Sequence, residues 1–140
     1  MTYTDLKSKL STHATTAGVS TYLFGYIEEL NTQIEKVKAD LYPVLLVIPP
    51  KWVYNDRADY FKTELTFYIV NDYTKALRAE ATQEGTWDYI GTIAEAFITA
   101  VNTDASLQVI SVCNSEPYPE GITVNDDLGA QFTLTLKIIC

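Results

Sequence analysis

Two segments of the chain alternate between apolar and polar residues, as half-buried strands do. The alternation between Tyr60 and Val70 predicts an antiparallel strand with one face on the core and the other toward water or a partner. The same alternation recurs between Gln131 and Ile139 and predicts a final strand of the same kind. In the first of these strands the residues predicted to face outward are Lys62, Glu64, Thr66 and Tyr68.

Other apolar runs predict shorter strands. Val44–Ile48 is a continuous apolar run between Pro43 and Pro49, which is typical of a central strand buried on both faces. Tyr22, Phe24 and Tyr26 alternate with smaller residues and predict a short strand, and residues 107–113 are rich in Val and Ile. Pro117, Pro119 and Gly121 predict a turn between that strand and the last one.

Two segments carry apolar residues at helical spacing. After Gly85, which we expect to end the polar stretch before it, Thr86 can cap a helix. One stripe of this helix carries Trp87, Ile90, Ala94, Phe97 and Val101, widened by Ile93 and Ile98. A shorter helix is predicted to begin with Thr4 as its N-cap and to end near His13.

The segment Ile27–Leu41 supports two interpretations. Its apolar residues recur at alternating steps of three and four, which favours a helix. A helix there would leave only Tyr42 before the next strand, which is short for a compact connection and favours an extended segment. The pattern leaves both structures open.

The predicted elements define an α+β fold. The chain has 140 residues, a size at which one domain can enclose one core, so we expect residues 1–140 to form a single domain. The order of strands and helices predicts a mainly antiparallel sheet of four to five strands with the helices packed on one face.

Charge and hydropathy exclude several classes of function. The formal net charge is -8, so the protein as a whole should repel polyphosphates, and direct DNA binding is disfavoured. The apolar run Val44–Pro50 is far shorter than the roughly 20 residues that a membrane-spanning helix needs. The first ten residues do not resemble a signal peptide, so we expect a protein that is made and kept in a cytoplasm.

The residue inventory gives no candidate catalytic or cofactor site. His13 is the only histidine and is expected on the surface, and three Cys and His residues in the whole chain are too few for a closed zinc site. Cys113 and Cys140 are expected to be reduced, with a disulfide between them left open. The acidic pairs 28–29 and 126–127 are expected to be solvated, and no glycine-rich phosphate loop occurs. We therefore expect no catalytic residue, cofactor or metal ion.

Aromatic residues in polar surroundings are the candidates for a protein interface. The chain has ten tyrosines, and large amphipathic side chains on loops and outer strand faces often contact partners. The candidates are Trp52, Tyr54, Tyr68 and Tyr118.

The order of these elements resembles the tail-terminator and tail-completion (neck) proteins of tailed bacteriophages. The resemblance covers nearly the whole chain and rests on the Tyr42-Pro43 start of an apolar strand, the two alternating strands and the helix led by Trp87. It implies a virion subunit, without enzymatic activity, that closes into a ring at the head–tail junction, commonly a hexamer. Its partners would be the tail tube protein and the head–tail connector proteins, and DNA would pass through the ring. The contacts with neighbours would be made by residues 51–59 and 116–127.

Two other classes of function fit the same pattern. Another connector or a baseplate subunit of a phage would share the acidity and the interfaces but occupy another place in the particle. A small-ligand-binding or enzymatic α+β domain would instead show a deep pocket with convergent polar groups, lined by Tyr or Trp.

Overall fold

The computed structural model describes residues 1–26, 43–51, 60–71, 80–111, 115–118 and 128–139. Within these ranges the chain forms two helices and six strands. Their order is α1 (Tyr3–Thr16), β1 (Thr21–Phe24), β2 (Val44–Ile48), β3 (Tyr60–Asn71), α3 (Glu80–Thr103), β4 (Leu107–Ser111), β5 (Ser115–Tyr118) and β6 (Leu128–Ile139). The predicted α+β class is confirmed, while residues 27–41, whose structure the sequence left open, lie outside the described part.

The strands form one mixed sheet in the order β1-β2-β3-β6-β4, with β5 also pairing with β6. Five strands or fewer were expected, and the structure has six because Ser115–Tyr118 pairs with β6 where only a turn was predicted. Pro117 is tolerated there because β6 is the only described neighbour of β5. On the opposite edge of β5 no described strand requires the amide donor that proline lacks. β1 runs parallel to β2, so the sheet is mixed; every other described pair is antiparallel.

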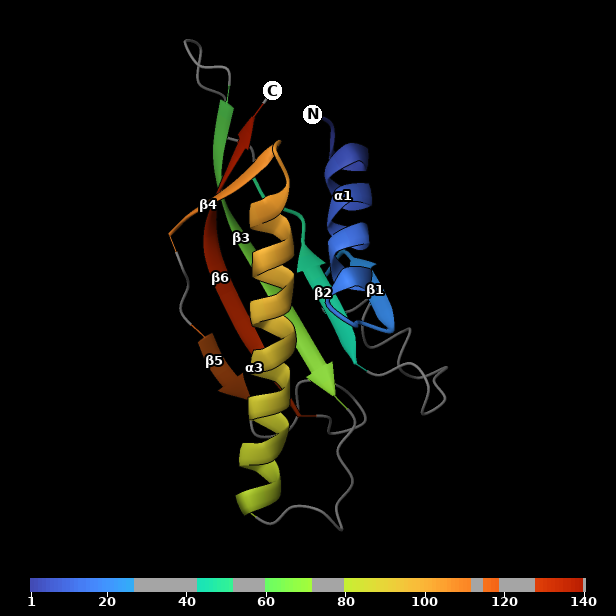
Figure 1. Ribbon diagram of the computed structural model, residues 1–140, viewed down its shortest axis with the longest axis vertical. Coiled ribbons are helices and arrows are strands. Elements are labelled where there is room, and N and C mark those ends of the chain that lie inside the picture. Colours follow the sequence, from blue (N-terminus) through green and yellow to red (C-terminus); the bar gives the residue numbers. More distant parts are fainter. Residues whose placement is uncertain (27–42, 52–59, 72–79, 112–114, 119–127, 140) are drawn as a thin grey trace.

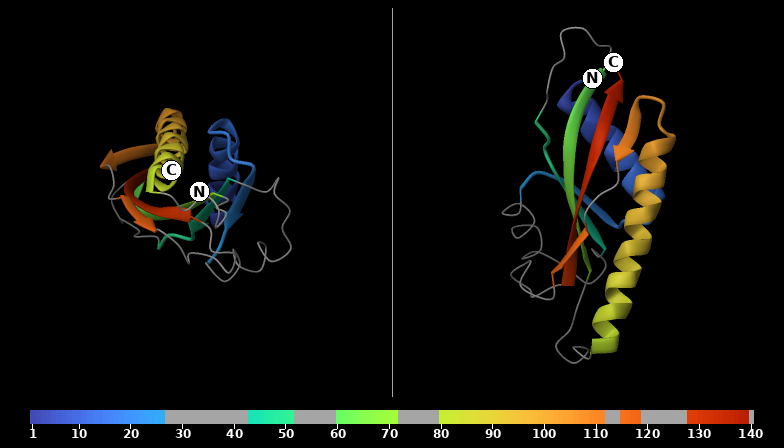
Figure 2. Two further views of the ribbon diagram at one scale, coloured as in Figure 1. Left: turned by 90° about the horizontal axis from the view of Figure 1, so that it is seen from below. Right: turned by 90° about the vertical axis from the view of Figure 1, so that its left-hand side faces the viewer.

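Both helices lie on one face of the sheet, as expected (Figure 1). Figure 2 shows the two helices side by side in one layer and the sheet in the other. The buried residues between the layers form one hydrophobic core. At its centre Phe67 of β3 packs edge-on against Phe97 of α3, with ring centroids 5.0 Å apart, and stacks on Phe132 of β6 at 5.2 Å. Among the described helices, none combines the length and apolar character that crossing a membrane requires.

The pairing of β3 with β6 sets which side chains face the helices. Leu65 lies opposite Leu134 and Phe67 opposite Phe132, and these four residues belong to the core. The alternate positions, including Lys62 opposite Lys137 and Tyr68 opposite Gln131, therefore lie on the outer face of the sheet. The two faces predicted for this strand are confirmed over residues 62–70.

Strand β2 is buried on both faces, as its proline-bounded apolar run predicted. Leu45 and Val47 contact the core under the helices, and Val44 and Leu46 are fully buried although they face the other way. Val70, which pairs with Val44, is buried on that outer face too. The outer face is therefore apolar and covered around these residues and polar toward the start of β3.

Helix α1 begins earlier and ends later than predicted. Its N-cap is Thr2 rather than Thr4: the Thr2 hydroxyl accepts a bond from the Asp5 amide, and the Asp5 carboxylate accepts one from the Thr2 amide. This reciprocal capping box satisfies two backbone donors at once, which favours the earlier start. The helix passes His13 and ends at Thr16, and the chain then turns at Gly18, whose φ of 89° favours glycine.

Helix α3 begins at Glu80, before the residues predicted to stop and cap it. Gly85 and Thr86 are both inside the helix, so the predicted start at Thr86 was wrong. One exposed glycine costs a helix only about 1 kcal/mol, and an already formed apolar stripe downstream can outweigh that cost. The stripe itself is confirmed, since Ile90, Ala94, Phe97 and Val101 are buried.

Strand β4 lies at the edge of the sheet beside β6. It ends at Ser111, and Cys113 at the end of the predicted strand lies outside the described residues. Its register shifts between Val109 and Ser111, which marks a bulge at the exposed Ile110. The Val109 amide donates to the Asn102 side-chain oxygen at 3.2 Å, so a side chain from the end of α3 occupies a donor on this edge.

We expect Gly18 and Gly85 to respond oppositely to substitution by alanine. A Cβ at Gly85 would meet nothing within 4 Å, so Gly85→Ala should raise the free energy of unfolding by about 0.5–1 kcal/mol through helix propensity. Gly18→Ala should lower it by about 1–2 kcal/mol because its φ is positive. Urea denaturation of both variants measures the difference. A destabilised Gly85→Ala protein would contradict a helix that begins before that residue.

Candidate functional site

A groove opens on the outer face of the sheet where β2 ends. Pro49 and Pro50 follow β2 directly and cannot continue its ladder, and the last pair of that ladder joins Ile48 to Thr66. The first residues of β3 pair onward with β6 alone among the described strands. The space that β2 would have filled becomes a cavity of about 460 Å³.

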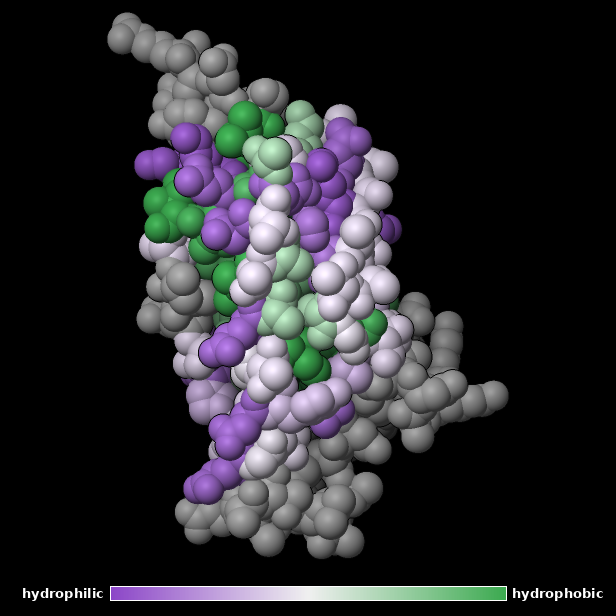
Figure 3. Space-filling view, viewed as in Figure 1, coloured by the Kyte–Doolittle hydropathy of each residue, from purple (hydrophilic) through white to green (hydrophobic). Residues whose placement is uncertain are grey.

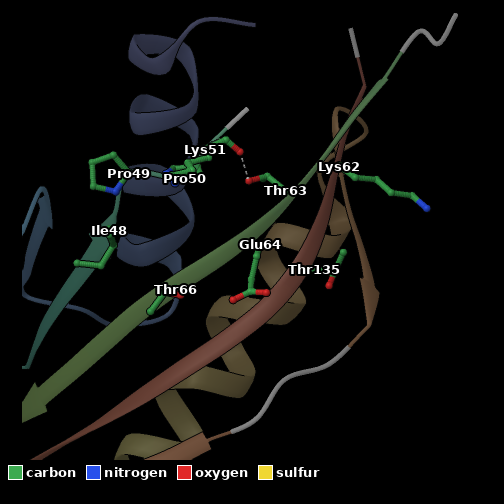
Figure 4. A pocket seen from close by; sticks show the side chains of 9 residues that line it. All are labelled: Ile48, Pro49, Pro50, Lys51, Lys62, Thr63, Glu64, Thr66 and Thr135. Atoms are coloured by element: carbon green, nitrogen blue, oxygen red, sulfur yellow. Dashed lines mark hydrogen bonds between the residues drawn. The ribbon is translucent and has the colours of Figure 1, made fainter. Parts of the chain in front are cut away.

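The walls of the groove are held by two hydrogen bonds. The Thr63 hydroxyl donates to the Lys51 carbonyl at 2.6 Å, and the Tyr3 hydroxyl of α1 donates to the Pro50 carbonyl at 2.6 Å. Figure 4 shows Pro49 and Pro50 on one side of the groove and Lys62 and Thr135 on the other. The prolines are thereby fixed as an apolar wall against β3.

The groove carries more positive than negative charge. Lys51 and Lys62 are exposed along it, and Glu64 is the single carboxylate among its described lining residues. Lys137 of β6 lies directly opposite Lys62 on the same face. With one acid, no histidine and no cysteine among the lining residues that the structure describes, the groove suits an apolar and anionic contact better than acid–base chemistry. Its described lining also contains no Tyr or Trp.

The exposed side of α3 carries the opposite charge. We name Glu84, Asp88 and Glu95 the acidic ridge; all three are exposed, and the helix contains no Lys or Arg. Hydrophilic side chains follow one edge of α3 in Figure 3. Tyr89, next to Asp88, is 46% exposed and is the large aromatic side chain that α3 presents to the surface.

A polar cluster ties α1 to the turn between α3 and β4. The Asp104 carboxylate lies 3.0 Å from His13 Nε2 and 3.4 Å from Lys9 Nζ. Its other oxygen accepts bonds from the Ser106 hydroxyl at 2.7 Å and the Ser106 amide at 3.0 Å. One carboxylate thus joins two elements that are about ninety residues apart in sequence.

The environment of Asp104 favours its ionised form. Burial by itself would raise the pKa, but the two bonds from Ser106, the bond from His13 and the charge of Lys9 together hold the pKa of Asp104 well below 3.8. Asp104 is therefore a charged anchor in neutral solution.

The cluster combines Ser, His and Asp side chains, yet it is not arranged as a nucleophilic triad. The Ser106 hydroxyl donates to the aspartate and not to the histidine, so His13 is not placed to act as the general base for Ser106. His13 was expected on the surface. The structure corrects this, because its side chain is only 15% exposed and is held by Asp104.

One buried polar atom lacks a described partner. The hydroxyl of Tyr22 in β1 is buried and makes no hydrogen bond within the described part of the chain. Tyr22 packs against the core beside the helices, and burial raises the pKa of its hydroxyl well above 10.0. The hydroxyl is therefore neutral and costs stability.

The four predicted interface residues are not brought together by the described structure. Trp52 and Tyr54 lie outside it, and so do most of the predicted contact segments 51–59 and 116–127. Tyr118 is placed by its backbone in β5. Tyr68 is on the outer face as predicted, but it is 9% exposed and its hydroxyl accepts a bond from Gln131 at 3.0 Å. The acidic pairs 28–29 and 126–127 and both cysteines also lie outside the described residues.

Sequence reasoning missed Asp104 and the groove. The signal for Asp104 was present in the sequence, because an aspartate two residues before a serine at a helix end commonly accepts a hydrogen bond from the serine amide. The groove had only a partial signal in the two prolines after β2, since its depth depends on how far β3 outruns β2. No group of His, Cys, Asp or Glu in the described residues could hold a metal ion.

No family model matches the sequence, and no curated protein matches it.

We expect Asp104→Asn to destabilise the protein by about 1.5–3 kcal/mol near neutral pH, because it removes the charge from several bonds. The folded-state pKa is lowered, so the stabilisation is present above 3.8 and is lost as pH falls below that value. The difference in unfolding free energy between wild type and variant should therefore be smaller at pH 3 than at pH 5. The exposed Asp88→Asn is the control, with a change within about 0.5 kcal/mol. A gap that is equal at both pH values would contradict this role.

Tyr22→Phe should leave the protein equally stable or raise the free energy of unfolding by about 1 kcal/mol, because the lost hydroxyl makes no described bond. Tyr3→Phe is the matched comparison, and it should lose about 0.5–1.5 kcal/mol with the bond to Pro50. Chemical denaturation of the pair distinguishes them. A loss at Tyr22 as large as at Tyr3 would reveal a partner for its hydroxyl.

Proposed function

We propose that this chain is a structural subunit of a tailed bacteriophage that closes into a ring at the head–tail junction. The ring terminates the tail tube and joins it to the head, and the subunit has no catalytic role. Its neighbours are further copies of itself, six in the simplest case, the tail tube protein and the head–tail connector proteins. The protein is made in the cytoplasm of the host and ends in the neck of the virion.

The observation that carries the proposal is the order of elements on which the resemblance rests. A proline-bounded strand buried on both faces (β2) is followed by a long alternating strand (β3), a long helix containing Trp87 and a final alternating strand (β6). β3 and β6 pair along all twelve residues, and both helices cover the same face. This leaves the polar part of the outer sheet face and the outer side of α3 as two broad surfaces for neighbours.

Charge supports the same function. The net charge of -8 disfavours adhesion to DNA, as a channel through which DNA passes requires. An enzymatic or small-ligand function has less support, because the groove is open and no acid and base meet among its described lining residues. The polar cluster of His13, Asp104 and Ser106 is occupied in holding α1 in place.

Sedimentation equilibrium of the purified protein over a range of concentrations, followed by negative-stain imaging, tests this function. We expect a species of several times the 15.7 kDa subunit mass that appears as a closed ring with a central channel. Addition of the tail tube protein should place that ring at tube ends. A protein that stays monomeric alone and with tail tubes would contradict the proposal, and so would a compact dimer without a channel.

A further inference from the structure

Two oppositely charged surfaces lie on opposite faces of the subunit. The acidic ridge and Tyr89 lie on the outer side of α3, and the groove with Lys51 and Lys62 lies on the outer face of the sheet. Because α3 and the outer sheet face are on opposite sides of the sheet, one subunit cannot bring the two surfaces together (Figure 2). Two copies can.

We propose that neighbouring copies associate front to back, with Tyr89 of one copy seated in the groove of the next and Asp88 paired with Lys62. This inference rests on the proposed ring and names the contact that closes it. The occupant of the groove is a second copy of this chain.

The chemistry of the two surfaces is complementary at the level of single side chains. An exposed aromatic ring loses water-exposed area when it packs against Pro49 and Pro50, and a tyrosine seated in a pocket is a frequent anchor of protein interfaces. Asp88 and Tyr89 are consecutive, so their side chains project about 100° apart and can reach two walls of one groove. The prolines form one wall and Lys62 stands at the other (Figure 4).

Charge complementarity extends beyond Asp88 and Tyr89. α3 contributes three exposed acids and no base, whereas three of the five lysines in the described residues, namely Lys51, Lys62 and Lys137, lie at the groove end of the outer face. A carboxylate of a neighbouring copy is attracted to Lys51 and Lys62 at this end of the face. The sizes also match, since α3 is about 36 Å long and β3 about 40 Å, enough for a contact of roughly 800 Å² per partner.

Such a contact joins two different surfaces and therefore generates rings or filaments rather than closed dimers. The groove lies where β2 ends and β3 begins, while Asp88 and Tyr89 are in the first half of α3, toward the other end of the molecule (Figure 1). In a ring, the groove of one copy and the helix surface of the next must lie at the same height along the ring axis. Because these surfaces are at opposite ends of each subunit, the long axis of the subunit is inclined to the ring axis.

A pair of charge reversals tests the contact. Asp88→Lys alone and Lys62→Glu alone each place like charges together, and we expect each to weaken association by about 30-fold or more. An equimolar mixture of the two variants should again form closed rings, because every contact in an alternating ring then pairs Lys with Glu or Asp with Lys. Rescue by mixing also shows that both variants are folded. Sedimentation and negative stain of each sample measure these outcomes.

Matched substitutions supply the controls. Tyr89→Ser should weaken association about as much as a charge reversal, whereas Tyr26→Ser, at a tyrosine that is 56% exposed, should not. Lys7→Glu makes the same charge change on exposed α1 and should leave rings intact. Raised salt should weaken the wild-type ring through its charge pairs.

The outcomes separate this contact from the proposed function. If both single variants formed rings at the same concentrations as the wild type, the front-to-back contact would be overturned, while the proposed ring function would remain supported. Folded single variants whose mixture does not assemble would overturn it as well. A wild-type protein that never forms rings would overturn the proposed function, and this contact with it.

Discussion

The ladder between β3 and β6 is the constraint on which the rest of the molecule depends. The two strands pair along twelve residues, and this register decides at once which side chains meet the helices and which form the outer face. Phe67 and Phe132 stack within the ladder, and Phe97 of α3 docks on them. A shift of the β3 register by one residue would turn Lys62, Glu64 and Tyr68 toward the core. The groove is a further product of the ladder, because it opens where β3 and β6 continue past the end of β2.

Periodicity predicted the ladder and the core well. The alternation of residues 60–70 and the apolar stripe of α3 report burial directly, because each side chain's face follows from its position. The ends of elements were harder to predict. Thr2 was overlooked in favour of Thr4, although only Thr2 has an acid three residues later. Gly85 was taken as a stop, but the penalty of one exposed glycine is small beside the packing of the turns that follow. The pairing of Ser115–Tyr118 depends on a distant strand, which a local pattern of prolines does not reveal.

The candidate surfaces, too, could be predicted from the sequence only in part. Tyr68 was correctly assigned to the outer face, yet whether a residue on that face is covered depends on the rest of the chain, and Tyr68 is almost fully buried. The charge of the outer face was visible in the sequence as single residues. Its concentration beside Pro49 and Pro50 became apparent only when the register placed Lys62 and Lys137 together. Asp104 is a similar case, because its partners His13 and Lys9 come from the other end of the chain.

The Asn102 side chain on strand β4 bears on how copies of this protein can meet. A sheet edge with free amides is a template on which the strand of another molecule can add, and repeated addition leads to aggregates without a fixed size. Here one edge amide is already bonded to Asn102, and the bulge at Ile110 interrupts the flat run beside it. Continuation of the sheet from one molecule into the next is therefore disfavoured along β4. Assembly is directed instead to surfaces of side chains, whose shape and charge can limit the number of copies that join.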